Sequence, residues 1–137
     1  YDGDVMSDML ATAYGSNAMM TSVLVSPDGK YEYEAAHGTV RRHYYKYQQG
    51  EAVSTNPMAL ICTWSGGLEK RGELDGNEAL RRFGLLIRES ALYVVEQENT
   101  MTADLAKITS RSDPQVVTGH QFIALVRTRL EEQFAVA

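Results

Sequence analysis

The strongest restriction on the fold comes from residues 76–99, GNEALRRFGLLIRESALYVVEQEN. Apolar side chains recur there every three or four residues and would share one helix face: Leu80, Phe83, Ile87, Ala91 and Val94. Asn77 precedes this run and suits an N-cap, because its side chain can accept a hydrogen bond from a free backbone N–H group. The segment therefore predicts a long amphipathic helix that must pack against other elements.

Other segments have helical signals of the same kind. Asn56 and Pro57 predict a second helix, with Asn56 as cap and Pro57 at the first position, where its missing N–H costs nothing. Residues 102–109 predict one or two helical turns, and residues 4–14 predict a short helix before Gly15. The side chains expected to face inward from the second helix are Met58, Ile61, Cys62 and Leu68. In the last expected helix, 120–134, four apolar residues lie four apart: Phe122, Val126, Leu130 and Phe134.

Extended structure is expected in only one region. A β-branched run at 21–25 is followed by the turn-forming residues Pro27, Asp28 and Gly29 and by a second extended run with alternating Tyr and Glu. The polar stretch SRSDPQVVTG, residues 110–119, is predicted to be a loop. The fold class is therefore α/β and helix-rich, with too few strands for a complete sheet.

Composition indicates the soluble globular class. The 137 residues fit one domain or a piece of one, and 44% are apolar with no tract of ~18 apolar residues, so no membrane segment is expected. The net charge of −5 argues against a general nucleic-acid surface. Cys62 is the only cysteine, which excludes an internal disulfide and a thiolate zinc site. The chain opens at Tyr1 without an initiator Met, and we expect it to be a portion of a longer protein.

Asp4 and Asp8 are candidate metal ligands. Four-residue spacing on a helix places two carboxylates on one face, where a hard divalent cation such as Mg²⁺ or Mn²⁺ would remove their repulsion. Acidic residues in a first helical turn also favour the helix dipole. On spacing alone this second interpretation is favoured.

The stretch EAAHGTVRRHYYKY, residues 34–47, is a candidate anion site. Gly38 would let a ligand approach the backbone, and Arg41, Arg42 and His43 supply donors at the start of a helical or turn segment. Arginine suits a phosphate because its planar group donates two hydrogen bonds at once. A solvated basic face explains the same residues equally well. No G-x-G-x-x-G, Walker loop or nucleophile elbow is found in the sequence.

Four segments in order resemble the homodimeric NADP-dependent isocitrate dehydrogenases of eukaryotic type: YDGDVMSD, MMTSVLVSPDGK, EAAHGTVRRHY and STNPMALICTW. The likeness covers nearly the whole chain and is strongest before residue 75. HGTVRRH argues for the NADP-dependent isocitrate branch, because related decarboxylating dehydrogenases usually read HGSAPD or HGTAP at this point. Arg41 departs from the family, where a small polar residue is common.

The resemblance implies roles for individual residues. Asp4 and Asp8 match metal ligands that hold Mg²⁺ or Mn²⁺, and Asp4 is also a candidate catalytic base. The residues that match NADP-binding positions are His37, Gly38, Thr39, Val40, Arg42, His43, Thr55 and Asn56. Among them, the side chains of Arg42 and His43 match those that hold the 2′-phosphate.

The resemblance also implies the whole activity, which is oxidative decarboxylation of isocitrate to 2-oxoglutarate with reduction of NADP. Residues 1–14 would be the last helix of a small domain, and residues 15–137 the C-terminal half of the large, NADP-binding domain. The active site would be shared between the subunits of a homodimer in the cytoplasm or mitochondria. The catalytic tyrosine and lysine and the substrate-binding arginines would lie outside these 137 residues, so the piece alone is expected to be inactive. A non-catalytic nucleotide- or anion-binding module is the alternative.

Overall fold

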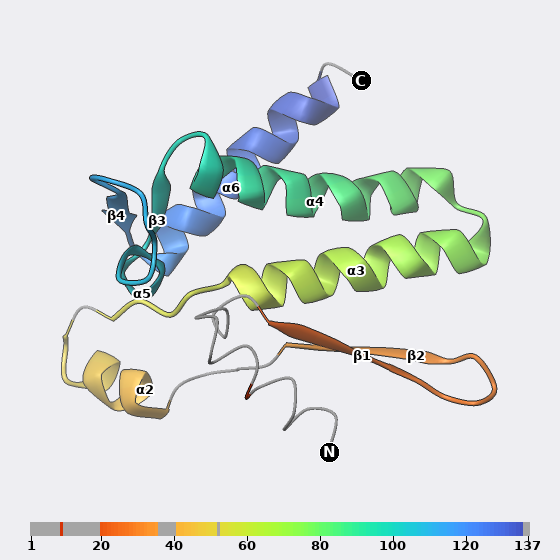
Figure 1. Cartoon of the computed structure of the whole chain (residues 1–137), viewed down its shortest axis with the longest axis horizontal. Helices are drawn as coiled ribbons and strands as arrows, with labels where there is room; N and C mark the ends of the chain where they lie inside the picture. Colours follow the sequence, from red (N-terminus) through yellow and green to blue (C-terminus); the bar gives the residue numbers. More distant parts are fainter. Residues whose placement is uncertain (1–8, 10–19, 36–40, 52, 136–137) are drawn as a thin grey trace.

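The structure is a computed structural model that describes residues 9, 20–35, 41–51 and 53–135. Its elements in chain order are β1 (Thr21–Val25), β2 (Tyr31–Ala35), α2 (Arg41–Gln48), α3 (Met58–Asp75), α4 (Glu78–Glu96), β3 (Thr100–Thr102), α5 (Ala103–Ala106), β4 (Gln115–Val117) and α6 (Gly119–Ala135). The β1–β2 hairpin lies along one side of α3, and α4 lies along the other (Figure 1). Helix α6 packs against α4, and α2 lies apart beyond the start of α3 (Figure 1).

The hairpin forms where the turn residues predict it. Strands β1 and β2 pair antiparallel, with Val23 opposite Tyr33. The Gly29 N–H donates to the Ser26 carbonyl at 2.9 Å, and Gly29 has φ 78°, a left-handed conformation that glycine adopts without strain. The expected strand, turn and strand are confirmed.

The long helices α3 and α4 are antiparallel neighbours joined at Gly76 and Asn77. Gly76 ends α3 with φ 62°, and Asn77 caps α4 by accepting a hydrogen bond from the Leu80 N–H group at 3.0 Å. The predicted cap of α4 is therefore confirmed. At the start of α3, Asn56 Oδ1 accepts from the Met58 N–H at 2.9 Å, while Pro57 is the residue directly before the helix rather than its first residue.

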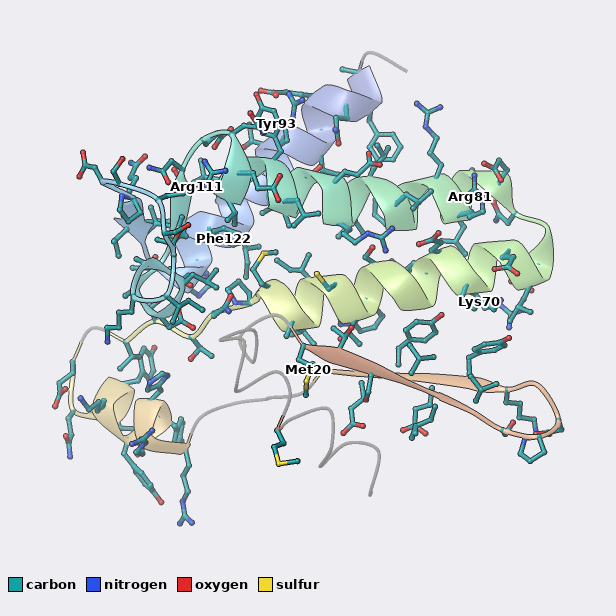
Figure 2. The ribbon with its side chains drawn as sticks, in the orientation of Figure 1. Met20, Lys70, Arg81, Tyr93, Arg111 and Phe122 are labelled. Carbon is teal, nitrogen blue, oxygen red and sulfur yellow. The ribbon has the colours of Figure 1, made fainter. Side chains whose placement is uncertain are left out.

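The core lies at one end of the α3–α4 pair, where α6, β3 and α5 meet it. Phe122, which Figure 2 labels on α6, is fully buried there. Among the described residues, the buried cluster consists of Met58, Ala91, Val94, Met101, Leu105, Phe122 and Val126. The predicted inward face of α4 is thus buried at Ala91 and Val94 and half-buried at its other positions. Leu68 lines the hairpin side of α3 rather than this core, and Phe134 is 47% exposed and contacts Phe83 with ring centroids 5.7 Å apart.

The prediction of a continuous loop at 110–119 is wrong at Gln115–Val117. These residues form β4, which pairs in parallel with β3 so that Met101 lies beside Val116. Each strand has three residues, too few for a periodic signal, and their pairing depends on a contact distant in the sequence. The expected helical turns at 102–109 are confirmed as the short helix α5, and the last expected helix is confirmed as α6.

The N-terminal helix and the fold class were also predicted from the sequence. The helix predicted at 4–14 lies outside the described residues, except for Met9. Within the described ranges, none of the helices has the length and apolar content needed to cross a membrane. The two small sheets, each with two strands, agree with the expected α/β, helix-rich class with an incomplete sheet.

Candidate functional site

The described part of the candidate site consists of α2 and the segment that leads into α3. Of the residues expected to bind a nucleotide, Arg42 and His43 lie in the first turn of α2, while Thr55 and Asn56 directly precede Pro57. His37, Gly38, Thr39 and Val40 lie outside the described residues, as do Asp4 and Asp8. The structure therefore describes four of the eight expected nucleotide-binding positions.

His43 and Thr55 are brought together although twelve residues separate them in the sequence. The Nδ1 atom of His43 lies 2.9 Å from the Thr55 Oγ1 atom, which is hydrogen-bond distance. Because Nδ1 faces Thr55, the other ring nitrogen, Nε2, is left for a different partner. No local signal in the sequence predicts this contact, because it depends on the path of the chain between α2 and α3.

Arg41 and Arg42 differ in what they contact. The guanidinium of Arg41 donates to the Tyr45 hydroxyl from Nε at 3.2 Å and from Nη2 at 3.0 Å, and its Cζ lies 5.5 Å from the centroid of that ring. Arg42 is exposed and has no hydrogen-bond or ion-pair partner among the described residues. Within the part of the chain that the structure describes, the guanidinium of Arg42 is therefore open to a ligand.

The charges of α2 are unusual for a helix N-terminus. Its sequence, RRHYYKYQ, contains no acidic residue, and two arginines occupy the first turn. Free N–H groups make this end of a helix positive, so cations here are repelled and an anion is favoured. The arrangement has the electrostatics of an anion site rather than those of an isolated helix.

The segment carrying Thr55 is anchored on both sides. Asn56 is only 3% exposed, and its side chain holds the first free N–H group of α3. On the other side, a Cβ atom at Gly119 would lie 2.9 Å from the Thr55 carbonyl oxygen, so the start of α6 contacts the backbone of Thr55 closely. Gly119 is a structural residue of the site that the sequence did not identify.

Metal ligands were expected at Asp4 and Asp8. Within the described ranges, no group of three or more His, Cys, Asp or Glu side chains is suited to hold a metal ion. The two aspartates lie outside those ranges, so the metal site stays a prediction from the sequence.

A groove between the hairpin and α3 lies apart from these residues. Its cavity volume is about 920 Å³, and its lining includes Tyr31, Tyr33, Trp64 and Lys70. Lys70, labelled in Figure 2 on α3, places its ammonium 4.6 Å from the centroid of the Tyr31 ring. Of the expected site residues that the structure describes, none lines this groove.

Cys62 behaves as a structural thiol. It is half-buried within α3 and packs against the core. Burial raises the pKa of the thiol above its ordinary value, and the nearby positive charge of Arg88 only partly opposes this effect. Since the thiolate is the reactive form, Cys62 is not suited to be a nucleophile.

Comparison with known proteins defines the class to which the chain belongs. Residues 1–126 match the family described as isocitrate/isopropylmalate dehydrogenase. The chain belongs to this family.

Particular relatives give a finer comparison. The chain is 50% identical over 135 residues to the mitochondrial NADP isocitrate dehydrogenase of Saccharomyces cerevisiae, covering 97% of this chain and 32% of the relative. It is 45% identical over 139 residues to the cytoplasmic NADP isocitrate dehydrogenase of the same yeast, covering 100% of this chain and 34% of that relative. With the human mitochondrial NADP isocitrate dehydrogenase it shares 56% identity over 107 residues, 77% of this chain and 24% of the relative. The chain thus spans about a third of the length of the two yeast relatives and about a quarter of the human one.

Proposed function

We propose that the protein is an NADP-dependent isocitrate dehydrogenase, which converts isocitrate to 2-oxoglutarate and CO₂ while NADP is reduced. The observation that carries this proposal is the identity of 45% to 56% to enzymes of that name, over 77% to 100% of the chain. Substrate and activity come from the names of these relatives, while the local geometry supports the choice of nucleotide. Residues 1–14 then belong to a small domain and 15–137 to the large, NADP-binding domain.

The 2′-phosphate of NADP is the anion assigned to α2. Arg42 supplies a guanidinium that has no partner among the described residues, and His43 presents its Nε2 atom while Thr55 occupies Nδ1. His37, Gly38, Thr39 and Val40 are assigned to the adenosine part, and Thr55 and Asn56 lie near the adenine. A hydrogen bond from a charged group to a phosphate contributes about 1.5–3 kcal/mol of binding free energy. This is enough for the protein to bind NADP about 10- to 100-fold more tightly than NAD.

A divalent cation is assigned to Asp4 and Asp8. Two carboxylates are a donor set suited to Mg²⁺ or Mn²⁺, which prefer oxygen ligands and leave coordination positions open for a substrate. When bound, such a metal polarises the oxygens of the substrate, and NADP provides the acceptor for the hydride. Asp4 is assigned a second role as the base that removes the proton from the isocitrate hydroxyl group.

The protein is further proposed to act as a homodimer with active sites shared between subunits. Neither a nucleic acid nor a membrane is expected as a partner. Relatives include mitochondrial and cytoplasmic enzymes and a peroxisomal enzyme of Candida tropicalis, and we assign this protein to the cytoplasm or mitochondria.

The activity is tested by following formation of NADPH by the full-length protein with isocitrate and Mg²⁺ or Mn²⁺. We expect turnover that a chelator abolishes and that NAD does not support. Specific binding of NADP without turnover of isocitrate would favour a non-catalytic nucleotide-binding module instead. The 137-residue chain expressed alone is expected to form no NADPH, because the substrate-binding arginines are assigned to the part of the relatives that it does not cover.

A further inference from the structure

We propose that Thr55 is a positioning residue for recognition of the NADP phosphate, acting through the imidazole of His43. The inference rests on the proposed function and deepens it, since it names how the phosphate-binding ring is held. It begins from the 2.9 Å contact between Thr55 Oγ1 and His43 Nδ1.

Helix α2 is held only weakly by packing within the described part of the chain. None of its residues is buried, and its hydrogen bonds Arg41–Tyr45 and Gln48–Tyr44 stay within the helix. Its ion pair between Lys46 and Glu51, at 3.4 Å, reaches only the adjoining turn. Among the described residues, the contact with Thr55 is therefore the side-chain hydrogen bond that joins α2 to the segment entering α3.

Thr55 is in turn held in place by its neighbours. The buried Asn56 side chain fixes the backbone at the start of α3, and Gly119 of α6 lies directly against the Thr55 carbonyl. An alanine at position 119 would place its Cβ 2.9 Å from that oxygen. The distance between the start of α6 and Thr55 is therefore set by backbone atoms. The hydroxyl of Thr55 thereby ties the ring of His43 to both α3 and α6.

The hydroxyl is compatible with the forms of the ring that can donate to a phosphate. A threonine hydroxyl can donate and accept, so it can donate to Nδ1 of a neutral imidazole or accept from Nδ1–H of an imidazolium. In both cases Nε2 carries a proton and can donate to a phosphate oxygen. The opposite neutral tautomer would present a lone pair at Nε2 and repel the anion. Thr55 thus holds the orientation of His43 with Nε2 turned away from it, and the phosphate itself favours the ring forms that carry a proton on Nε2.

The test compares NADP and NAD binding by the full-length protein with Thr55→Val, which keeps the side-chain shape but removes the hydroxyl. Loss of one hydrogen bond is expected to weaken NADP binding about 2- to 12-fold more than NAD binding, because only NADP carries the phosphate that His43 contacts, whereas the adenine near Thr55 is common to both nucleotides. Thr55→Ser keeps a hydroxyl and should retain the wild-type preference for NADP. Thr128→Val is the matched control, because the Thr128 hydroxyl is also exposed and donates only to the Ala124 carbonyl of its own helix, at 3.1 Å.

A second readout is independent of folding effects in the variants. The ¹⁵N chemical shifts of the wild-type His43 ring, assigned with His43→Gln, report which nitrogen carries the proton. We expect protonated Nε2 in the NADP complex; a proton on Nδ1 alone would overturn the proposal. Equal weakening of NADP and NAD by Thr55→Val, or no weakening of either, would also overturn it. If Arg42→Ala weakens NADP binding more than NAD binding but Thr55→Val does not, only the positioning role of Thr55 is contradicted. If neither variant weakens NADP binding more than NAD binding, the proposed phosphate site is contradicted as well.

Discussion

The hydroxyl of Ser65 on α3 donates a hydrogen bond of 2.7 Å to the carbonyl oxygen of Gly84 on α4. Both residues are buried, and the backbones of the two helices approach closely at this point. A Cβ atom at Gly84 would lie 2.6 Å from the Glu69 nitrogen and 2.8 Å from the Ser65 carbonyl oxygen. Further along, a Cβ at Gly72 would lie 2.3 Å from the backbone nitrogen of Arg81. The packing of α3 against α4 therefore depends on Gly72 and Gly84. This helix pair supports the segment that leads into α3 and carries Thr55.

Gly84→Ala is expected to destabilise the protein. The added methyl group would meet backbone atoms of α3, which can yield only if the helices separate, and overpacking of this kind lowers the free energy of unfolding by about 1–3 kcal/mol. Gly67→Ala is the control, because a Cβ there meets only the Tyr33 ring at 3.9 Å. That control should be neutral or stabilising by up to about 1 kcal/mol, since alanine favours a helix interior. Urea denaturation measures both, and equal effects would contradict close packing at Gly84.

Asn77→Ala should remove the cap of α4. The Leu80 N–H group would lose the side-chain acceptor it now contacts at 3.0 Å, at a cost of about 1 kcal/mol. Asn77→Asp keeps an acceptor and adds a negative charge favourable at this helix end, so it should retain stability. For the alanine variant, and not for the aspartate variant, we expect a lower midpoint of urea denaturation. The slope of the free energy of unfolding against urea concentration should be unchanged. An aspartate variant as unstable as the alanine variant would show that the cap is not the reason.

The pKa of the Cys62 thiol, raised by burial, has a consequence for stability at high pH. In the unfolded chain the thiol ionises near its ordinary value of about 8.5, whereas in the folded protein it keeps its proton to higher pH. Unfolding then releases a proton, and the free energy of unfolding falls as pH rises above that value. Burial also raises the pKa of Tyr33, but this tyrosine is present in the matched variant as well.

Cys62→Ala isolates the thiol contribution. The stability difference between wild type and Cys62→Ala is expected to be constant at neutral pH and to shift against the wild type above about pH 8.5. Denaturation at a series of pH values measures it. A constant difference throughout the alkaline range would contradict the raised pKa.

Features fixed by neighbouring residues were predictable from the sequence. The cap at Asn77 joins atoms three residues apart, and the turn at Gly29 depends on one left-handed residue, so both follow from local chemistry. Pro57 was placed one residue too far into α3, a boundary error of the size expected where a helix begins.

Features that depend on distant contacts were not predictable in this way. The β3–β4 pair joins Met101 to Val116, and each strand is too short to show alternation. The close contact of Gly119 with Thr55 depends on where α6 begins relative to α3. Within the site, the sequence identified His43 and Thr55 as separate candidates, but only their positions in the fold show that they share a hydrogen bond.

The proposed phosphate site is tested most directly by a titration of the full-length protein with NADP and with NAD, repeated for Arg42→Ala. We expect the variant to lose about 10- to 100-fold in NADP affinity and to bind NAD as before, because only NADP carries the 2′-phosphate. Arg41→Ala is the matched control and should change NADP affinity little, since the Arg41 guanidinium is already bonded to Tyr45. Equal loss of both nucleotides in Arg42→Ala, or no loss of either, would contradict the phosphate site at the start of α2.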